Sequence, residues 1–386
     1  MGGYRLAYFD NAATTWPKPE YVYELMDRFY RQHGTNVGRG NYEQSRSAGS
    51  LVSDTRIKMQ GLLHCSAKQV VFTPTATIAL NMVIQGLCAS GKHQFYISPF
   101  EHNAVTRTLH HQEKTGAAHV EQIYVSQTLE FDLQRIRYQF DLLRPDVVVI
   151  SHASNTIGLL APVEELCRLS KKYGAVTVLD MSQTAGLVDC NVGSEDIDFA
   201  IFDGHKTLYG PTGIAGFVMK PDLPLPAVIF GGTGYDSANQ DMPDSLPERF
   251  EVGTMNISGV AGLNAALEWI EEVGRANIYA AEAAHRERLL KMFSEYSYIH
   301  VVGNEPSREY VGIVSCLFDS VGSDSAGALL SRLGISVRTG LHCAPSAHKF
   351  LGTYPAGTIR FSVSYFTSDE EFRQLKKALD IIEDEL

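Results

Sequence analysis

Lys206 stands at a position where an amine could react with an aldehyde. The segment Asp198-Phe-Ala-Ile-Phe-Asp-Gly-His-Lys206 begins as an apolar run typical of a buried strand, and Gly210, Pro211 and Gly213 then predict a tight turn. A lysine at the mouth of a buried sheet is partly desolvated, which favours its neutral amine. Schiff-base chemistry requires such an amine, although a Gly-His-Lys tripeptide alone also suits an ordinary surface loop.

A carboxylate at the end of another predicted strand adds to this interpretation. The apolar run Val176-Thr-Val-Leu ends in Asp180, and neighbouring parallel strands bring their carboxyl ends to one edge of a sheet. Pyridoxal 5'-phosphate (PLP) needs a lysine to carry it and a carboxylate to keep its pyridine nitrogen protonated. Asp180 alone could be a helix cap or a metal ligand, but together with Lys206 it predicts a PLP site.

Two segments could bind the phosphate of such a cofactor. Thr73-Pro-Thr-Ala-Thr77 lies between a predicted strand and a predicted helix, so its hydroxyl groups and helix N-terminal amides could face an anion. Phe250-Glu-Val-Gly-Thr254 also presents a hydroxyl group after a glycine. Neither segment is a P-loop, and each taken alone is more often an ordinary turn or helix cap.

Among the six cysteines, Cys343 has the setting best suited to chemistry. Its neighbours Arg338, Gly340 and His342 are polar or flexible, and a cationic setting favours the thiolate. The sequence has no Cys-x-x-Cys pair, so we expect neither a metal site nor a disulfide framework. On this basis alone a functional and a structural role for Cys343 are equally open. We expect structural roles for the other five, which are Cys65, Cys88, Cys167, Cys190 and Cys316.

Alternating strands and helices are predicted to position these residues. Short apolar runs rich in β-forming residues predict seven strands, at Gln69–Phe72, Gln94–Ile97, Val120–Tyr124, Val147–Ser151, Val176–Asp180, Phe199–Phe202 and Ile214–Met219. Amphipathic stretches between them predict helices at Thr77–Leu87, Val105–Glu113 and Pro162–Tyr173, the last opened by its proline. This alternation is typical of an α/β fold with a mostly parallel sheet buried on both faces.

The pattern changes after Thr254 and predicts a second, smaller α+β domain. It contains a long helical region over roughly Gly259–Ser294 and a closing helix from Ser368 to about Glu385, with strands near Val311–Phe318, Ser336–Arg338 and Thr358–Val363. We divide the chain into a large domain over residues 18–257, a connecting helix over 258–274 and a small domain made of 1–17 and 275–386. The cleft between the two domains is the expected site.

Composition narrows the possible partners and the compartment. The chain has 386 residues, 44% of them hydrophobic, and a formal net charge of -11, which argues against nucleic acid or an anionic membrane as a partner. No apolar run reaches the roughly 18 residues of a membrane-spanning helix, and the first residues do not resemble a signal peptide. We therefore expect a cytoplasmic protein.

Ordered motifs along nearly the whole chain resemble the class V aminotransferase family, and within it the Suf-type (group II) cysteine desulfurases and selenocysteine lyases. The motifs are Tyr8-Phe-Asp-Asn-Ala-Ala-Thr-Thr15, Asn36-Val-Gly-Arg-Gly40, Glu101-His-Asn-Ala104, Ser154-Asn-Thr-Ile-Gly158, Asp180-Met-Ser-Gln183, Gly204-His-Lys206, Phe250-Glu-Val-Gly-Thr-Met-Asn256 and Arg338-Thr-Gly-Leu-His-Cys-Ala344. The resemblance implies PLP fold type I, with a seven-stranded, mostly parallel sheet flanked by helices in the large domain and a smaller α+β C-terminal domain.

The resemblance also implies how the cofactor is held. Lys206 would carry PLP, His102 would stack on its ring, and Asp180 would pair with its nitrogen. Gln183 would hydrogen-bond the phenolic oxygen. Thr77 and His205 would bind the phosphate, and Thr254 would reach it from the other subunit of a homodimer. The remaining residues implied at the cofactor are Ala76, Asn155 and Asp203.

The substrate implied by the resemblance is L-cysteine, or L-selenocysteine. Asn155 and Arg360 would hold its carboxylate, and a bidentate clamp suits the planar guanidinium group, although a surface ion pair is the plainer interpretation of Arg360. Arg338, Asn11 and Ala12 would also contact the substrate. Lys206 would move the proton of the α-carbon and Cys343 would take the sulfur as a persulfide, leaving L-alanine. A protein sulfur acceptor and iron–sulfur cluster assembly belong to the same expectation.

Three positions depart from the Suf-type pattern. Asp203 stands where a small or hydroxyl residue usually precedes Gly-His-Lys, and its carboxylate would repel a phosphate dianion unless it points away or pairs with a cation. Leu341 and Tyr42 stand where a histidine is often found. Another class V activity (transaminase, racemase or β-lyase) or a noncatalytic scaffold that binds a sulfur carrier are the alternatives, and neither needs the motif around Cys343.

Overall fold

A seven-stranded β-sheet lies at the centre of the molecule, in a computed structural model that describes residues 6–37, 40, 42–235 and 238–385. Strand β8 runs antiparallel to both of its neighbours, whereas the other neighbouring pairs are parallel, so the predicted mostly parallel sheet is confirmed. The order across the sheet is β2 (Gln69–Thr73), β8 (Ala215–Met219), β7 (Phe199–Asp203), β6 (Val176–Asp180), β5 (Val147–Ser151), β3 (Gln94–Ile97) and β4 (His119–Gln122).

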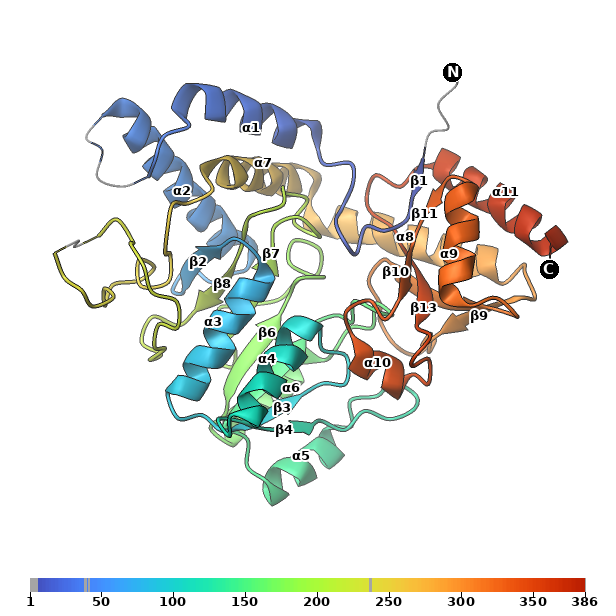
Figure 1. The fold of residues 1–386 in the computed structure, drawn as a ribbon, viewed down its shortest axis with the longest axis horizontal. Helices are drawn as coiled ribbons and strands as arrows, with labels where there is room; N and C mark the ends of the chain where they lie inside the picture. Colours follow the sequence, from blue (N-terminus) through green and yellow to red (C-terminus); the bar gives the residue numbers. More distant parts are fainter. Residues whose placement is uncertain (1–5, 38–39, 41, 236–237, 386) are drawn as a thin grey trace.

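Helices cover both faces of this sheet (Figure 1). One face packs against α3 (Ala76–Ala89) and α4 (Asn103–Lys114). The opposite face packs against four helices, α2 (Glu43–Leu62), α5 (Leu133–Leu142), α6 (Val163–Lys172) and α7 (Ile257–Val273). Helix α1 (Glu20–His33) lies on α7 and α2.

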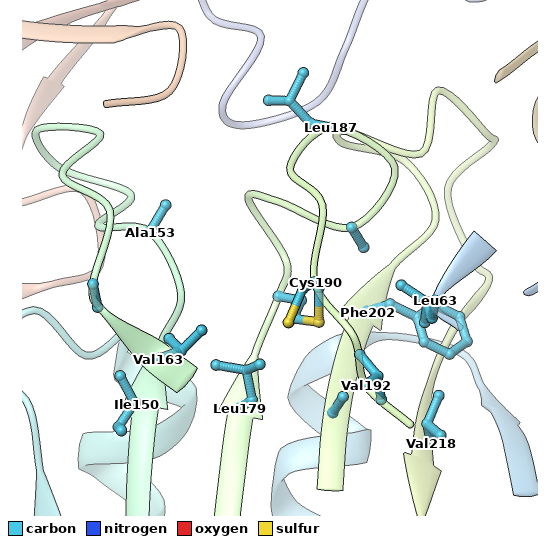
Figure 2. Close-up of a cluster of buried hydrophobic side chains, with 14 of the residues drawn as sticks. Leu63, Ile150, Ala153, Val163, Leu179, Leu187, Cys190, Val192, Phe202 and Val218 are labelled. Carbon is cyan, nitrogen blue, oxygen red and sulfur yellow. The ribbon is translucent and has the colours of Figure 1, made fainter. Parts of the chain in front are cut away.

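The central strands are mostly apolar because both of their faces are buried. Successive residues point to opposite faces, so Val149 packs with α3 and α4 while Ile150 packs with the helices of the other face. Figure 2 shows part of the hydrophobic cluster that contains Ile150, including Leu179 and Phe202 from neighbouring strands. Cys190 lies in the same cluster, and burial raises the pKa of its thiol to about 12, as expected of a structural cysteine.

A four-stranded antiparallel sheet forms the smaller part of the molecule, at the right of Figure 1. Its order is β12 (Arg338–Gly340), β13 (Thr358–Ser362), β10 (Ile313–Phe318) and β9 (Ile299–Val302). The chain start joins it, since β1 (Ala7–Tyr8) pairs with β11 (Ile335–Ser336). The helices of this part are α8 (Arg275–Phe293), α9 (Ser323–Arg332), α10 (Pro345–Phe350) and α11 (Asp369–Glu385).

The long helical region predicted over Gly259–Ser294 is helical in the structure but is divided in two. The structure has two helices, α7 and α8, which meet at Gly274. Gly274 has a φ of 86°, which lies outside the helical region and is tolerated because glycine lacks a Cβ. Residues that favour helices, mainly Ala, Leu and Glu, lie on both sides of this break, so helix propensity alone does not show it.

Smaller differences concern short elements of the same region. The strand predicted over Ser336–Arg338 is two strands in two sheets, β11 beside β1 and β12 beside β13, separated at Val337. Strands β1 and β9 were not predicted. Helix α6 begins at Val163, one residue later than predicted, and Pro162 is its N-cap.

Glu282 of α8 connects the two parts of the molecule through a buried hydrogen bond. The hydroxyl of Tyr209 donates to Oε1 of Glu282 at 2.6 Å, and the backbone amide of Tyr365 donates to the same hydroxyl at 2.8 Å. Burial raises the pKa of Glu282 from 4.5 to about 8, although the Tyr209 hydrogen bond opposes that rise. The folded protein therefore keeps this carboxyl protonated at pH values where the unfolded chain ionises it.

We expect Glu282→Gln to remove a pH-dependent loss of stability. The raised pKa stabilises the fold fully below about pH 4.5, and this contribution is lost as pH rises to about 8. Relative to the Glu282→Gln variant, whose amide mimics the protonated carboxyl, the wild type should lose up to about 1.4 kcal/mol per pH unit over that range. Urea unfolding at several pH values measures the difference.

The matched control for this comparison is Glu287→Gln on the same helix. The side chain of Glu287 is 74% exposed, so its substitution should leave the pH dependence of unfolding unchanged. An unfolding free energy that follows the same pH curve in wild type and Glu282→Gln would contradict the burial argument.

Candidate active site

A cavity opens beyond the carboxyl ends of β5, β6 and β7. About 430 Å³ of space not filled by atoms, part of it open to solvent, lies between its lining residues. Crevices at this edge of a parallel sheet are where ligands bind in open α/β folds. The cavity brings together much of the predicted site, because its lining includes Ala76, Thr77, His102, Asn155, Asp180, Gln183, Asp203 and Lys206.

Lys206 reaches this cavity from a turn that follows β7. Two hydrogen bonds from Thr15 hold the backbone of the turn. The amide of Thr15 donates to the carbonyl of His205 at 3.0 Å, and its hydroxyl donates to the carbonyl of Lys206 at 2.9 Å. The side chain of Lys206 is 16% exposed, and its Nζ lies 3.6 Å from Oδ2 of Asp203. The turn therefore directs an amine into a largely enclosed space, as predicted.

Asp180 ends β6 at the same edge, with 6% of its surface exposed. Its Oδ1 accepts hydrogen bonds from the amide and the hydroxyl of Ser182, at 2.9 and 2.6 Å. Its Oδ2 has no hydrogen-bond partner among the described residues, so one carboxylate oxygen is left for a ligand. Ser182 was not predicted, although its place within Asp180-Met-Ser-Gln183 was a usable signal.

His102 caps the N-terminus of α4. Its Nδ1 accepts a hydrogen bond from the amide of Ala104 at 3.0 Å, which leaves the ring proton on Nε2. Burial lowers the pKa of His102, and the charge of Lys206 lowers it further against the opposing effect of Asp180 and Asp203. The ring is thus a neutral imidazole that lines the cavity, which suits the predicted stacking on a pyridine ring.

Gln183 and Asn155 each use part of their amide group within the protein. Nε2 of Gln183 donates to the carbonyl of Ala12 at 2.8 Å, and Nδ2 of Asn155 donates to the carbonyl of His342 at 2.7 Å. Oδ1 of Asn155 is buried with no partner among the described residues. Both side chains line the cavity, and each keeps some hydrogen-bonding capacity for a ligand.

Asp203 does not point away from the predicted phosphate-binding residues. Its Oδ2 lies 3.2 Å from Nε2 of His205 and 3.6 Å from Nζ of Lys206. Burial alone would raise the pKa of Asp203, but the hydrogen bond from His205 and the charge of Lys206 hold it below its usual value. The carboxylate is therefore ionised, with a hydrogen bond from His205 and the charge of Lys206 beside it.

Arg360 is buried in β13, with 2% of its surface exposed. It donates to the carbonyl of Asn155 at 2.8 Å and to Oδ1 of Asp10 at 3.0 Å, while its Nε has no partner among the described residues. Arg338 lies 3.8 Å from the other oxygen of Asp10 and is 45% exposed. Asp10 thus holds two predicted substrate-binding arginines together, a role that the sequence did not reveal.

Asn11 and Ala12 lie outside the cavity that contains Lys206. They line a separate small cavity together with Ser362. The amide of Asn11 is used within the protein, since Nδ2 donates to the carbonyl of Ser362 at 2.9 Å and Oδ1 accepts from the amide of Trp16 at 3.1 Å. Their predicted contact with substrate remains untested.

Cys343 is exposed and lies on a loop with an unusual backbone. His342 and Cys343 have φ values of 45° and 57°, a left-handed conformation that costs a non-glycine residue about 1–2 kcal/mol. Two hydrogen bonds to the larger part of the molecule hold this loop, from Asn155 Nδ2 to the His342 carbonyl and from the Asn103 amide to the Cys343 carbonyl, both 2.7 Å. Asn103 was not predicted to have this role.

The ring of His342 is buried behind the loop. Its Nε2 lies 2.8 Å from the hydroxyl of Thr358, and burial together with the charge of Arg360 lowers the pKa of this histidine to about 2. His342 therefore stays neutral and anchors the loop. The positive charge near Cys343 comes instead from Arg360, with which its thiol interacts electrostatically.

Thr254 lies away from this cavity within the chain. It is exposed and lines a different, mostly apolar cavity of about 850 Å³ with Phe72, Met82 and Phe250 among its walls. Tyr42, which also departs from the Suf-type pattern, immediately precedes α2 and is 49% exposed. Gly38 and Arg39 of the Asn36–Gly40 motif lie outside the described residues.

The chain is similar to known proteins along nearly its whole length. Residues 7–375 match the family described as "Aminotransferase class-V". The chain is 31% identical to a probable cysteine desulfurase of Vibrio cholerae over 99% of this chain and 96% of that protein, and 30% identical to a cysteine desulfurase of Haloferax volcanii over 97% and 89%. The apo structure of a cysteine desulfurase from Thermococcus onnurineus NA1 superposes with a TM-score of 0.90 at 29% identity, covering 99% of this chain and 95% of that one.

Proposed function

Since the chain belongs to the class V aminotransferase family, we propose that it is a PLP-dependent cysteine desulfurase that converts L-cysteine to L-alanine and receives the sulfur on Cys343. One observation carries the assignment of Cys343. Asn155 lines the cavity of Lys206 and also holds the carbonyl of the residue before Cys343, at 2.7 Å. An exposed thiol is therefore tied to the wall of the cavity in which the lysine lies.

The residues present fit PLP. Asp180 has an oxygen left for the pyridine nitrogen, His102 offers a neutral ring, and Nδ1 of His205 is buried with no partner among the described residues. Thr77 and Ala76 lie at the first turn of α3, where backbone amides favour an anion. Gln183 completes the set, and Lys206 would carry the group. When bound, PLP supplies an electron sink for the bonds at the substrate's α-carbon.

The remaining residues supply binding, proton transfer and sulfur transfer. Arg360, Arg338 and Asn155 would bind the carboxylate of the substrate, and the amine of Lys206 would take the proton from its α-carbon. The thiolate of Cys343 would then bond to the substrate sulfur while the carbon–sulfur bond breaks. The resulting persulfide stays on the enzyme, and protonation of the carbon completes alanine.

The same arrangement would accept L-selenocysteine, because selenium occupies the place of sulfur and the carboxylate clamp is unchanged. We extend the proposal to that substrate and to a protein acceptor that collects the persulfide sulfur, with iron–sulfur cluster assembly as its use. The exposure of Cys343 supports transfer to an acceptor. A transaminase, racemase or β-lyase would have no use for a thiol there.

The proposal includes a homodimer in which Thr254 completes the phosphate site of the other subunit. Three observations support it. Thr254 is exposed and does not line the cavity that contains Lys206 of the same chain. The cavity that it does line is mostly apolar, and nearby Ile229 and Phe230 are 37% and 73% exposed. Exposed apolar groups around a polar side chain are typical of a surface covered by a partner.

The division into domains also remains a proposal, with residues 18–257 as the large domain, 258–274 as a connecting helix and 1–17 with 275–386 as the small domain. The pairing of β1 with β11 supports placing the chain start in the small domain. The break between α7 and α8 at Gly274 supports the boundary after the connecting helix.

We propose a cytoplasmic location on the basis of composition. No helix in the described part of the chain is both long and apolar enough to cross a bilayer. The formal net charge of -11 opposes attachment to an anionic membrane surface.

Incubation of the PLP-loaded protein with L-cysteine, without reductant, tests the proposed reaction. We expect alanine to appear together with one added sulfur on the peptide that contains Cys343, mapped by mass spectrometry. Alanine and persulfide should form in equal amounts in the first turnover, because one sulfur leaves for each alanine made. Another amino-acid product with unmodified Cys343 would contradict the desulfurase assignment and favour a different class V activity.

A further inference from the structure

Asp203 places a negative charge where the cofactor's phosphate is expected. It ends β7 with 7% of its surface exposed and lines the same cavity as Ala76 and Thr77 of the α3 N-terminus. Its two ion-pair contacts, to His205 and Lys206, both use Oδ2. Oδ1 has no hydrogen-bond or ion-pair partner in the part of the chain that the structure describes.

Few cations are available to balance this carboxylate together with a phosphate. Helix α3, which packs against β7, has no acidic or basic side chain. Among the described residues, four ionisable groups contact Asp203 or interact with it electrostatically, namely His205 and Lys206 after β7, His102 before α4 and Lys18 of the N-terminal segment. Asp180 at the end of β6 lines the same cavity.

Lys18 is the least obvious of these groups. Its Nζ donates to the carbonyl of His205 at 2.6 Å, and its charge interacts with that of Asp203. Burial lowers the pKa of Lys18 to about 7 despite the opposing effect of Asp203. Near neutral pH this ammonium group is therefore only partly charged, and it compensates the carboxylate incompletely.

The charges do not balance if the phosphate binds as a dianion. A phosphate monoester has its second pKa near about 6, so it carries almost two negative charges above neutral pH. Asp203 would bring the total to three. Among the described residues a partly charged Lys18 is the amine left to face that total, because Lys206 is occupied with the cofactor and His102 is neutral. His205 contributes a hydrogen bond to Asp203. Like charges in a buried site are relieved by taking up a proton.

We propose, on the basis of the proposed function, that Asp203 makes this site bind the cofactor's phosphate in its singly protonated form, with the phosphate hydroxyl donating a hydrogen bond to Oδ1 of Asp203. One proton is then taken up from solvent when the dianion binds. The carboxylate acts as an acceptor for the bound group rather than as a repelling charge. Asp203 is thus a residue that selects the protonation state of the phosphate.

Binding of PLP and of pyridoxal to the full-length protein without cofactor tests this proposal. Pyridoxal lacks the phosphate, so the ratio of the two dissociation constants isolates the contribution of that group at each pH. In the wild type the advantage of PLP over pyridoxal should fall by up to about tenfold per pH unit above about pH 6, the slope expected for uptake of one proton. In Asp203→Asn the ratio should be independent of pH, and PLP should bind more tightly than to wild type at pH 8.

Two further measurements locate the proton. The ³¹P resonance of bound PLP should lie at the monoanion position in the wild type at pH 7 and at the dianion position in Asp203→Asn. Lys18→Gln should keep the pH slope, because the proton is on the phosphate and not on Lys18. A dianion resonance in the wild type, a slope that survives Asp203→Asn, or a slope abolished by Lys18→Gln would each overturn the proposal.

Failure of the proposal about Asp203 can be distinguished from failure of the proposed function. Asparagine has the same shape as aspartate, and unchanged binding of pyridoxal would show that the variant is folded with an intact lysine site. If the wild type binds neither pyridoxal nor PLP, the proposed function is wrong and the inference about Asp203 is overturned with it.

Discussion

Lys206→Ala should form alanine from L-cysteine about 10³-fold more slowly than the wild type, or not measurably. The substitution removes both the amine that carries the cofactor and the base that takes the α-proton, and proton transfer by a positioned side chain alone contributes about 10²–10⁴-fold. The variant should also lose the yellow colour of lysine-bound PLP. Single-turnover alanine formation and the visible spectrum of the purified protein measure the two effects.

The control for this prediction is Lys172→Ala. Lys172 is exposed in the last turn of α6, so its loss should leave colour and rate within about twofold of wild type. A yellow, active Lys206→Ala protein would show that another amine carries the cofactor.

Cys343→Ser should separate cofactor binding from sulfur transfer. The variant should stay yellow, because Cys343 is not among the residues that line the cavity of Lys206. Alanine formation from L-cysteine should fall about 10³-fold, since a serine hydroxyl is a poor nucleophile toward sulfur and loss of a nucleophile costs at least that much in comparable enzymes. Alanine assays with a thiol reductant present, and persulfide mapping without it, give the two readouts.

Cys88→Ser provides a matched control, because Cys88 is the other described cysteine that is not fully buried. Burial raises the pKa of its thiol to about 11, so it holds almost no thiolate at neutral pH and should be dispensable. Retention of alanine formation in Cys343→Ser, with the added sulfur found on another cysteine, would move the acceptor role elsewhere.

The strands of the large sheet could be predicted because they are buried on both faces. Runs such as Val147–Ser151 and Val176–Asp180 are apolar before the polar residue that ends them, apart from Thr177, and the structure has them with the same bounds. Their parallel order places the strand ends at one edge. That rule alone predicts that Asp180 and Lys206 lie together, and both line one cavity.

Features that depend on distant parts of the chain could not be predicted in this way. Asp10 pairs with Arg360, which follows it by most of the chain length, and neither position has a local pattern that identifies the other. Asn103 holds the loop of Cys343 with its backbone amide, and a pattern of side chains does not reveal a backbone hydrogen bond. Lys18, in Trp16-Pro-Lys-Pro, resembles an exposed loop lysine until the fold places it beside His205.

The helix break at Gly274 had a weak local signal. An isolated glycine inside a helical pattern is tolerated, and only its positive φ in the folded chain separates α7 from α8. The short strands β9 and β11 were missed or misplaced for a related reason. Strand β11 spans two residues, too few for an alternating pattern to emerge, and in the four residues of β9 His300 interrupts the apolar run.

The backbone of His342 and Cys343 has a consequence for how sulfur would leave the enzyme. Two successive left-handed residues with both carbonyls hydrogen-bonded to the large sheet's side of the molecule leave the loop little freedom to move as a unit. The sulfur atom consequently stays within a side chain's length of where it was received. The travel needed for delivery then has to be made by the receiving molecule, whose own reactive group must extend to the mouth of the cavity.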